Sequence, residues 1–536
     1  MMKKAIKKLL AALLAVAMVC AMAIPAFAYN PGETKEDLNA IHGYSAFQIF
    51  TGDVSDDNTI SNVKWGSNIT DPAAFLEQLK NDSTIGTQFQ FADATDAADA
   101  ATAQEVFAVI SKWSNSDDNS IAFARVVCHY LYPDANANPT PVATGHTGGF
   151  EVPKPGYYLI VDTTYFSLSD FYHAYNSFLL KVTKAHYGFT INHKVVKPYV
   201  EKEVYDNQDG TNEAGFGSSA DHAINEEFQF KLTATLPASP DRAYDYYKEY
   251  AVLFNDTLSN GITYDGLDSV VIESNGTHYD ITNESSKYEV DDSRLGSDNY
   301  FVVGIPDVKT CAPGLNLNAG ATITVTYTAH LNENAAVNGS IDNKNKVQLQ
   351  YSNNPRNSAY WGFTPESEVR VYTYQLNNTK YRDDDIPGNE LAGAGFSLYS
   401  DEACTQEVKL YKEGAFYYPI KNATGKTAVE MKSAADGTFN VKGLDAGTYY
   451  LKETTPPAGY SACDKTRIVI SATHDEHNVN LSGESNLNNK IINIKAGGIT
   501  LPSTGGIGTT LFYVVGGGLM VAAIVLLVTK KRMENK

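Results

Sequence analysis

Short segments in which apolar and polar residues alternate recur between residues 226 and 472 of the sequence. Before about residue 370 they are EEFQFKLTATLP, DSVVIES, YFVVGIP, ATITVTYTAHL and NKVQLQYSN, and after it they are AGFSLYS, GTFNVKGL, GTYYLKET and TRIVISA. Turn signals such as Ser-Asn-Gly and Asn-Gly separate the segments. Because alternation with a period of two makes one face of a strand apolar, these residues are expected to form two antiparallel β-sandwiches.

The first part of the sequence, up to about residue 190, mixes two kinds of pattern. YSAFQIFTGDV and GGFEVPKPGYYLIVDTT have the apolar content of strands, whereas DPAAFLEQLKN and ATDAADAATAQEVFAVISKWS carry apolar residues at helical spacing. Asp71 and Thr95 stand where N-caps are expected for these two helices. The pattern predicts an α+β domain in front of the two sandwiches.

Both ends of the chain carry the features of exported proteins. Lysines precede the apolar run LLAALLAVAMVCAMAI, and Ala26 and Ala28 form an A-x-A pattern after it. Residues 1–28 are therefore predicted to be a cleaved signal peptide rather than a membrane anchor. At the other end, residues 507–529 are apolar over a length that crosses a bilayer as a helix, and a Lys-Lys-Arg cluster follows them.

The exported part is strongly acidic. The whole chain has 42 basic and 62 acidic residues, which is a net charge of −20. The signal peptide holds four of the basic residues, and the part after Thr504 holds four more with one acid, so 34 basic and 61 acidic residues remain, a net charge of −27. This charge excludes nucleic acid and anionic lipid as partners and favours solubility.

Four cysteines remain after the signal peptide, and they are widely spaced: Cys128, Cys311, Cys404 and Cys463. No C-x-x-C motif or Cys/His cluster is present, so we expect no metal site and no cofactor. The acidic turns in DGTNEAG and SDDN could bind calcium weakly but are expected to face water. Cys128 and Cys311 are predicted to be unpaired small residues.

The end of the chain resembles the cell-wall sorting signal of Gram-positive surface proteins, since an apolar span and basic residues follow Leu501, Pro502, Ser503, Thr504 and Gly505. The resemblance implies that a sortase cleaves between Thr504 and Gly505. The sortase cysteine then holds the Thr504 carbonyl as a thioester, which a primary amine resolves. Until then the apolar span keeps the substrate beside a membrane-bound enzyme.

Most of the chain resembles the isopeptide-forming backbone pilins of Gram-positive bacteria, through YSAFQIFTGDV, NVKWG, KVVKPYVEKEV, DTLSNGITY, NKVQLQYSNNP, LAGAGFSLYS and YYLKETTPPAGY. The resemblance implies a mostly β protein: tandem Ig-like β-sandwich domains of the Cna-A and Cna-B types, preceded by an α+β N-terminal pilin domain and followed by a transmembrane sorting helix. The domains are expected at residues 29–195, 196–370 and 371–497, with the sorting signal at 498–536.

The resemblance also implies how subunits are joined. In this family the threonine of one subunit is linked to a lysine of the next, and Lys194 in INHKVVKPYV stands at the position of the pilin motif. Lys197 is the alternative acceptor. The implied partners are a class C pilus sortase and a housekeeping sortase, other copies of the chain, minor pilins, peptidoglycan, and an unidentified ligand on a host or bacterial surface.

Pilins of this family also form Lys–Asn isopeptide bonds within a domain, without a separate enzyme. The reaction requires a buried lysine whose amine is neutral, an asparagine carboxamide against it, and a protonated acid that polarises the carboxamide and transfers protons. In the third domain the resemblance implies Lys380, Asn493 and the isopeptide-promoting acid Glu453. Glu453 lies in YYLKETTPPAGY, which is similar to the family's E-box.

In the middle domain the resemblance implies Lys202, Asn345 and the promoting acid Asp256, with Asn343 as the alternative to Asn345. Lys202 lies in YVEKEV between two valines that share its strand face, which favours a lysine that points inward.

Two further expectations concern a cross-link in the first domain and a disulfide bond in the third domain. Around YYLIVD no glutamate has the register of the E-box and Asp162 is one place further along, so we expect no self-formed cross-link in the first domain. Cys404 and Cys463 both fall in the third domain, where some members of the family have a disulfide. Because export permits disulfides, a Cys404–Cys463 bond is expected.

The function implied by the resemblance is that of a shaft subunit of a covalently polymerised pilus, attached to the cell wall and formed from a membrane-bound precursor. Such a subunit is a sortase substrate and not a turnover enzyme. The alternatives are a minor or tip pilin and a monomeric wall-anchored adhesin, which carry the sorting signal without needing an acceptor lysine. A wall-anchored hydrolase is disfavoured because no G-x-S-x-G or H-E-x-x-H motif is present.

Overall fold

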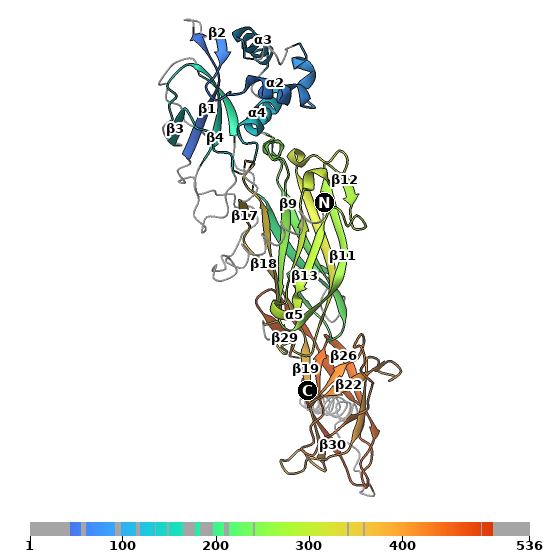
Figure 1. The fold of residues 1–536 in the computed structure, drawn as a ribbon. Coiled ribbons are helices and arrows are strands. Elements are labelled where there is room, and N and C mark those ends of the chain that lie inside the picture. Colours follow the sequence, from blue (N-terminus) through green and yellow to red (C-terminus); the bar gives the residue numbers. More distant parts are fainter. Residues whose placement is uncertain are drawn as a thin grey trace, which may run out of the picture.

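The computed structural model describes residues 43–496 except for residues 55–59, 92–97, 114–117, 135, 147–149, 164–176, 183–196, 208–213, 240–241, 340–341, 357–359 and 484. The described residues form an elongated molecule of three regions in chain order, from the first region in blue to the third in orange (Figure 1). A large apolar core lies within each region.

The first region is an antiparallel sheet with helices packed against it (Figure 1). The sheet order is β2-β1-β4-β5, and β3 pairs with the other part of β1. Its strands and helices are β1 (Gly43–Val54), β2 (Ile60–Trp65), α2 (Pro72–Asn81), η1 (Gly86–Phe89), α3 (Ala100–Ile110), α4 (Asp118–Leu131), β3 (Ala143–His146), β4 (Gly156–Asp162) and β5 (Ser177–Val182). Phenylalanines from the sheet and from the helices meet in one core, among them Phe50, Phe75 and Phe123.

The first predicted helix is confirmed together with its cap. Helix α2 begins after Asp71, whose side chain accepts a hydrogen bond of 3.0 Å from the backbone N–H of Ala74. The predicted cap Thr95 lies outside the described residues, and α3 begins after Asp99. Helix α4 was not predicted from the sequence.

The middle region consists of two sheets that share one core. One sheet has the order β13-β14-β10-β16-β18-β8, with β17 paired to β16, and the other has the order β12-β11-β15-β9-β6-β7. The strands are β6 (Tyr199–Asp206), β7 (Gly215–Gly217), β8 (Ser219–Asp221), β9 (Glu227–Leu236), β10 (Val252–Leu258), β11 (Ile262–Ser274), β12 (Thr277–Asp280), β13 (Glu289–Arg294), β14 (Tyr300–Ile305), β15 (Ala321–Leu331), β16 (Lys344–Ser352), β17 (Trp361–Phe363) and β18 (Ser367–Tyr372). Short helical turns join them: η3 (Ala243–Tyr246), α5 (Leu295–Asp298), η4 (Val308–Thr310) and η5 (Leu317–Ala319).

The alternation in the sequence produces this sandwich directly. Along β15 every second residue is buried, from Ala321 to Leu331, and the same period is seen along β9. The turn between β11 and β12 has Asn275 and Gly276 at φ values of 51° and 73°, the left-handed pair that tight hairpins require. Pattern and turn together determine which face of the hairpin is buried.

The third region is a smaller pair of sheets. One has the order β22-β23-β25-β19-β30, and the other has the order β21-β20-β26-β27, with β24 paired to β20. The strands are β19 (Tyr374–Arg382), β20 (Gly395–Tyr399), β21 (Glu407–Val408), β22 (Leu410–Glu413), β23 (Phe416–Pro419), β24 (Met431–Lys432), β25 (Asn440–Leu444), β26 (Gly447–Thr455), β27 (Thr466–Ile470) and β30 (Asn488–Asn493), and a separate hairpin is made of β28 (Ala472–His474) and β29 (Val479–Leu481).

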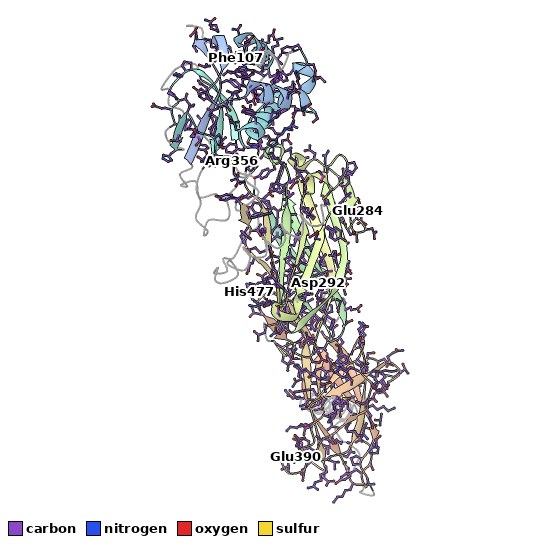
Figure 2. All side chains as sticks on the ribbon, in the orientation of Figure 1. Phe107, Glu284, Asp292, Arg356, Glu390 and His477 are labelled. Atoms are coloured by element: carbon purple, nitrogen blue, oxygen red, sulfur yellow. The ribbon has the colours of Figure 1, made fainter. Side chains whose placement is uncertain are left out.

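The three regions contact one another at two junctions. At the first, Arg356 of the middle region lies close to the first region (Figure 2) and donates a hydrogen bond to the backbone oxygen of Asp162. Tyr246 packs into the core of the first region. At the second, β18 ends at Tyr372 and β19 begins at Tyr374, so a single residue connects the middle and third regions.

The structure does not test the predicted segments at the two ends of the chain. The signal peptide and the span at residues 507–529 lie outside the described residues. Among the helices that are described, none has the length and apolar character needed to cross a membrane. The protein is mostly β over its described part.

Candidate functional site

Lys202, Asp256 and Asn345 come together in the core of the middle region. Lys202 projects from β6 of one sheet, and Asp256 and Asn345 project from the paired strands β10 and β16 of the other sheet. The three residues are at most 3% exposed. The strands alternate in burial, and all three residues fall on inward positions.

Tyr327 on β15 connects the three side chains, and the sequence analysis did not identify it. The Lys202 Nζ donates to Asp256 and, at 3.1 Å, to the hydroxyl oxygen of Tyr327. The Tyr327 hydroxyl donates to Oδ1 of Asp256 at 3.2 Å and accepts from Nδ2 of Asn345 at 2.5 Å. The acid, the amine and the carboxamide thus meet at one hydroxyl group. In the sequence, the only indication of this role is that Tyr327 falls on an inward position of the alternating segment ATITVTYTAHL.

The surroundings shift the amine and the acid toward their neutral forms. Burial lowers the pKa of Lys202 to about 8, although the Asp256 charge opposes the shift. Burial also raises the pKa of Asp256, against the opposing effect of Lys202. The rings of Phe230 and Tyr327 lie 5.1 and 5.2 Å from the Lys202 Nζ and exclude water from it. A neutral amine beside a protonated carboxyl group is what amide exchange requires.

The two asparagines that the sequence left open have different surroundings. The Asn345 carboxamide lies in the cluster, and its Oδ1 has no hydrogen-bond partner among the described residues. The Asn343 carboxamide is instead bound to the backbone: it accepts from the N–H of Ala336 at 2.7 Å and donates to the oxygens of Ala336 and Val371 at 2.8 and 3.1 Å. Asn343 therefore clamps two backbone segments, and Asn345 is the asparagine beside Lys202.

Lys380, Asn493 and Glu453 form a second cluster in the third region. The Lys380 Nζ donates to Oδ1 of Asn493 at 2.5 Å, and Nδ2 of Asn493 donates to Oε1 of Glu453 at 2.8 Å. The same carboxylate oxygen is 3.9 Å from the Lys380 Nζ. The side chains of Lys380 and Glu453 are both 0% exposed. Glu453 is therefore in contact with the carboxamide and lies close to the amine.

Strand pairing explains how Lys380 reaches Asn493. Strand β19 begins the third region and β30 ends it, and the two run parallel with Lys380 opposite Ile491 and Arg382 opposite Asn493. Asn493 is thus the diagonal neighbour of Lys380 on the same face of the sheet. Glu453 reaches the pair from β26 of the facing sheet. Burial lowers the pKa of Lys380, while nearby Cys463 and Glu453 oppose the shift.

The expected disulfide between Cys404 and Cys463 is wrong, because both cysteines are free in the structure. Cys463 lies beside the second cluster, where its backbone N–H donates to Oε2 of Glu453 at 2.8 Å. Cys404 lies in a turn with a left-handed φ of 55°. Cys128 and Cys311 are buried, and neither forms a disulfide bond with another described cysteine, as predicted.

The structure leaves the joining residues untested. Lys194 and the five sorting-signal residues 501–505 lie outside the described part of the chain. Lys197 is half-buried just before β6. Asp162 is buried at the end of β4, and the described residues of the first region include no buried lysine beside it. Nothing in this part of the structure forms a third cluster of the same kind.

Comparisons with known proteins identify two parts of the chain. Residues 377–486 match the family model of the SpaA prealbumin-like fold domain. Residues 493–535 match the family model of the LPXTG cell wall anchor motif. The trypsin-resistant surface T6 protein of Streptococcus pyogenes is 25% identical over 407 residues, which cover 65% of this chain and 71% of that protein.

Several solved structures are similar to the chain. The T6 backbone pilin of Streptococcus pyogenes is 15% identical with a TM-score of 0.49, covering 85% of this chain and 96% of that one. The full-length major pilin SpaD of Corynebacterium diphtheriae is 21% identical with a TM-score of 0.40, covering 68% and 88%. The C-terminal fragment of the major pilin GBS80 of Streptococcus agalactiae is 20% identical with a TM-score of 0.39, covering 55% and 99%.

The anchor motif and the SpaA domain define the class: this is a Gram-positive surface protein attached to the cell wall through its LPXTG signal. Within that class the chain carries a SpaA prealbumin-like fold domain and is similar over 65% of its length to the T6 surface protein of Streptococcus pyogenes.

Proposed function

We propose that the protein is the shaft subunit of a covalent pilus, in which Thr504 of one copy is joined to Lys194 of the next. Lys197 remains the alternative acceptor. The proposal includes two internal bonds, Lys202–Asn345 and Lys380–Asn493. The observation that carries it is the pair of buried clusters, each with a lysine, an asparagine and an acid in contact or linked through one hydroxyl group.

The chemistry is one amide exchange in each cluster. The neutral lysine Nζ attacks the asparagine Cγ, the bond from Cγ to Nδ2 breaks, and ammonia leaves with a proton taken from the amine. In the middle region Asp256 and Tyr327 are placed to carry that proton, and in the third region Glu453 lies near both nitrogens. One amide replaces another, so no oxidant or energy carrier is needed.

The positions of the two bonds fit a subunit that carries tension. In a fibre joined at Lys194 and Thr504, force enters just before β6 and leaves just after β30. It crosses from Lys202 to Asn345 and from Lys380 to Asn493 through covalent bonds, so neither sandwich is pulled open. The first region lies outside this path, and none of its lysines whose burial the structure describes is buried.

Cell-wall extracts test the assembly. A shaft subunit gives a ladder of high-mass species that survives boiling in detergent, and Lys194→Ala collapses the ladder to monomers while Lys197→Ala leaves it intact. The reverse result assigns Lys197. A ladder that is unchanged when the gene for this protein is deleted identifies a minor or tip pilin and overturns the proposal.

Intact mass tests the internal bonds. The purified chain is expected to weigh less than its sequence by two ammonias, and tandem mass spectrometry of a digest should find Lys202 joined to Asn345 and Lys380 joined to Asn493. Asn343→Ala is the matched control for Asn345→Ala. The Asn345→Ala chain should lack only one ammonia relative to its own sequence, whereas the Asn343→Ala chain should still lack two. A wild-type mass equal to that of the processed sequence would contradict both bonds.

A further inference from the structure

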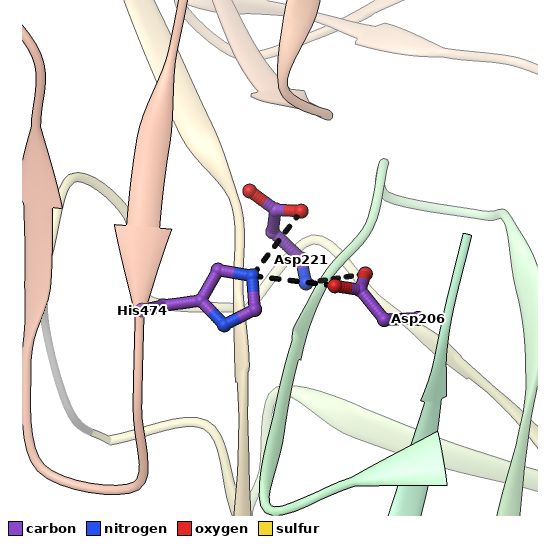
Figure 3. Close-up of side chains that lie close together, drawn as sticks. All are labelled: Asp206, Asp221 and His474. Atoms are coloured by element: carbon purple, nitrogen blue, oxygen red, sulfur yellow. Dashed lines mark hydrogen bonds and ion pairs between the residues drawn. The ribbon is translucent and has the colours of Figure 1, made fainter. Parts of the chain in front are cut away.

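Three side chains that the proposed function does not use meet at the second junction. Asp206 ends β6 and Asp221 ends β8, both in the middle region, and His474 ends β28 in the third region. Figure 3 shows the two carboxylates and the imidazole ring turned toward one another. Each of the three side chains is at most 8% exposed.

In each of these side chains, the nitrogen or oxygen atom that does not face the other two side chains makes a hydrogen bond, and this bond fixes the orientation of the side chain. Nδ1 of His474 lies 2.8 Å from Oγ of Ser219, and Oδ2 of Asp221 accepts from the hydroxyl of Tyr374 at 2.6 Å. Oδ1 of Asp206 accepts from the backbone N–H of Asp221 at 3.3 Å. In the tautomer whose Nδ1–H donates to Ser219, the Nε2 lone pair faces the carboxylates. Such outer bonds are how proteins fix the tautomer and direction of metal ligands.

The inner atoms have the spacing of ligands around an ion. Nε2 of His474 is 3.5 Å from Oδ2 of Asp206 and 3.6 Å from Oδ1 of Asp221. These distances are longer than a charge-assisted hydrogen bond of about 2.8 Å. They are close to the edge of roughly 3.4 Å that a tetrahedron has when its ligands are about 2.0–2.1 Å from zinc. Oδ1 of Asp221 is fully buried and accepts no hydrogen bond from the described residues.

The negative charge of the two buried carboxylates also favours binding of a cation between them. Two buried carboxylates beside a neutral imidazole leave two negative charges in a medium of low dielectric constant, which is costly. A divalent ion neutralises both. A proton on His474 neutralises only one of them, and it is the competing occupant: burial lowers the pKa of His474, but the nearby carboxylates of Asp206 and Asp221 raise it to about 9.

We propose that Asp206, Asp221 and His474 form a binding site for a divalent transition-metal ion, with zinc as the best match. One nitrogen and two oxygen ligands suit zinc, and water completes the fourth position. The ion joins strand ends of two regions whose consecutive strands β18 and β19 are separated in the chain by Thr373. The sequence analysis expected no metal site because its ligands are scattered and follow no short motif.

A second group of metal-ligating side chains lies nearby and makes a useful contrast. His222, Glu226 and Asp445 also approach one another. Their carboxylate oxygens already accept hydrogen bonds, however: Glu226 from Lys421 and from a backbone N–H, and Asp445 from Asn207 and from a backbone N–H. That group therefore lacks the unpartnered carboxylate oxygen that Asp221 provides, although Nδ1 of its His222 is buried and has no hydrogen-bond partner among the described residues.

Calorimetry with zinc chloride tests the site on the purified full chain after treatment with a chelator. We expect one zinc ion to bind per chain, and Asp221→Asn and His474→Gln each to weaken binding by at least tenfold. Cobalt chloride should give the visible absorption of a tetrahedral complex. His477→Gln is the matched control, since its exposed side chain lies in the turn of the same hairpin and should leave binding unchanged.

One measurement needs no variant and so does not depend on how variants fold. In nitrogen-15 spectra of the wild-type chain, zinc should shift one histidine Nε2 resonance, assigned to His474 by its contact with Tyr372. Zinc that binds without moving this resonance, or that binds equally to a chain carrying all of Asp206→Asn, Asp221→Asn and His474→Gln, overturns the proposal. Absence of zinc binding at pH 8 also overturns it and leaves the protonated histidine as the occupant.

Discussion

The carboxamide nitrogen of Asn345 lies 2.5 Å from the hydroxyl oxygen of Tyr327, and that hydroxyl donates to Asp256. Tyr327 is therefore the bridge between the leaving group of the proposed exchange and the acid that promotes it. Burial raises the pKa of Tyr327 well above its usual value, so the hydroxyl keeps its proton. A protonated hydroxyl can pass a proton along the chain of hydrogen bonds without becoming charged in the core.

The first prediction concerns this bridge. Tyr327→Phe should slow formation of the Lys202–Asn345 bond by roughly 100-fold, the size of effect that a positioned proton donor supplies. The ring and its packing are kept, so the region should still fold. Intact mass measured at intervals after refolding gives the rate at which ammonia is lost.

Tyr264→Phe is the control for this experiment. The Tyr264 ring touches that of Tyr327, with centroids 5.4 Å apart, but its hydroxyl makes none of the hydrogen bonds within the cluster. If Tyr327→Phe forms the bond as fast as Tyr264→Phe does, the hydroxyl has no part in proton transfer.

The second prediction concerns the third region. Glu453→Gln should leave the Lys380–Asn493 bond unformed, because the acid that contacts the carboxamide is gone. Relative to its own processed sequence, the chain should lack one ammonia instead of two. Since the bond closes a loop of 113 residues, its loss should lower the free energy of unfolding of this region by roughly 5 kcal/mol, by analogy with a disulfide across a loop of that length. Denaturant titration followed by circular dichroism measures the difference.

Glu402→Gln is the matched change, because its side chain is 77% exposed in the same region. It should leave both the mass loss and the unfolding curve as in the wild type. A Glu453→Gln chain that still loses two ammonias would show that another group promotes the exchange.

Local patterns were enough to predict the strands. Every second residue of ATITVTYTAHL is apolar or aromatic, and the corresponding residues are buried along β15. The turn at Asn275 and Gly276 could also be predicted from the local sequence, because few residues other than asparagine and glycine adopt its left-handed φ values easily. Helix α4 was not predicted, although its inward face is apolar.

Contacts between distant strands were harder to predict. Tyr327 could not be assigned to the middle cluster, because its place there depends on which strands of the two sheets face each other. The disulfide was wrong for a related reason. Both cysteines fall in the third region, but Cys463 is held beside Lys380 and Glu453 by the fold, whereas Cys404 lies in a separate turn. Spacing along the chain does not contain that information.

The third prediction uses the pKa of Lys202. Asn345→Ala removes the partner of the exchange, so Lys202 stays an amine whose pKa burial lowers from 10.5 to about 8 in the folded chain. Between these values the unfolded chain binds more protons than the folded chain, so stability must rise with pH. The gain should approach but not exceed about 3 kcal/mol.

Urea unfolding from about pH 7.5 to about pH 9.5 measures this slope, below the range in which tyrosines of the unfolded chain ionise. The double variant Lys202→Met/Asn345→Ala has no amine at this position. Its free energy of unfolding should therefore lack the increase with pH that Lys202 causes. Equal slopes in the single and double variants would mean that the folded Lys202 keeps an ordinary pKa.

The fourth prediction concerns the thiols. Burial raises the pKa of Cys463 to about 11 and that of Cys311 to about 12. Because the thiolate is the reacting form, iodoacetamide at pH 8 should modify Cys463 roughly 100-fold more slowly than it modifies free glutathione. Cys404 lies in a turn outside the second cluster and should be the first of the four to react. Peptide mapping after timed quenching gives the order, and the wild-type mass under non-reducing conditions should not be lower by the two hydrogens that a Cys404–Cys463 bond removes.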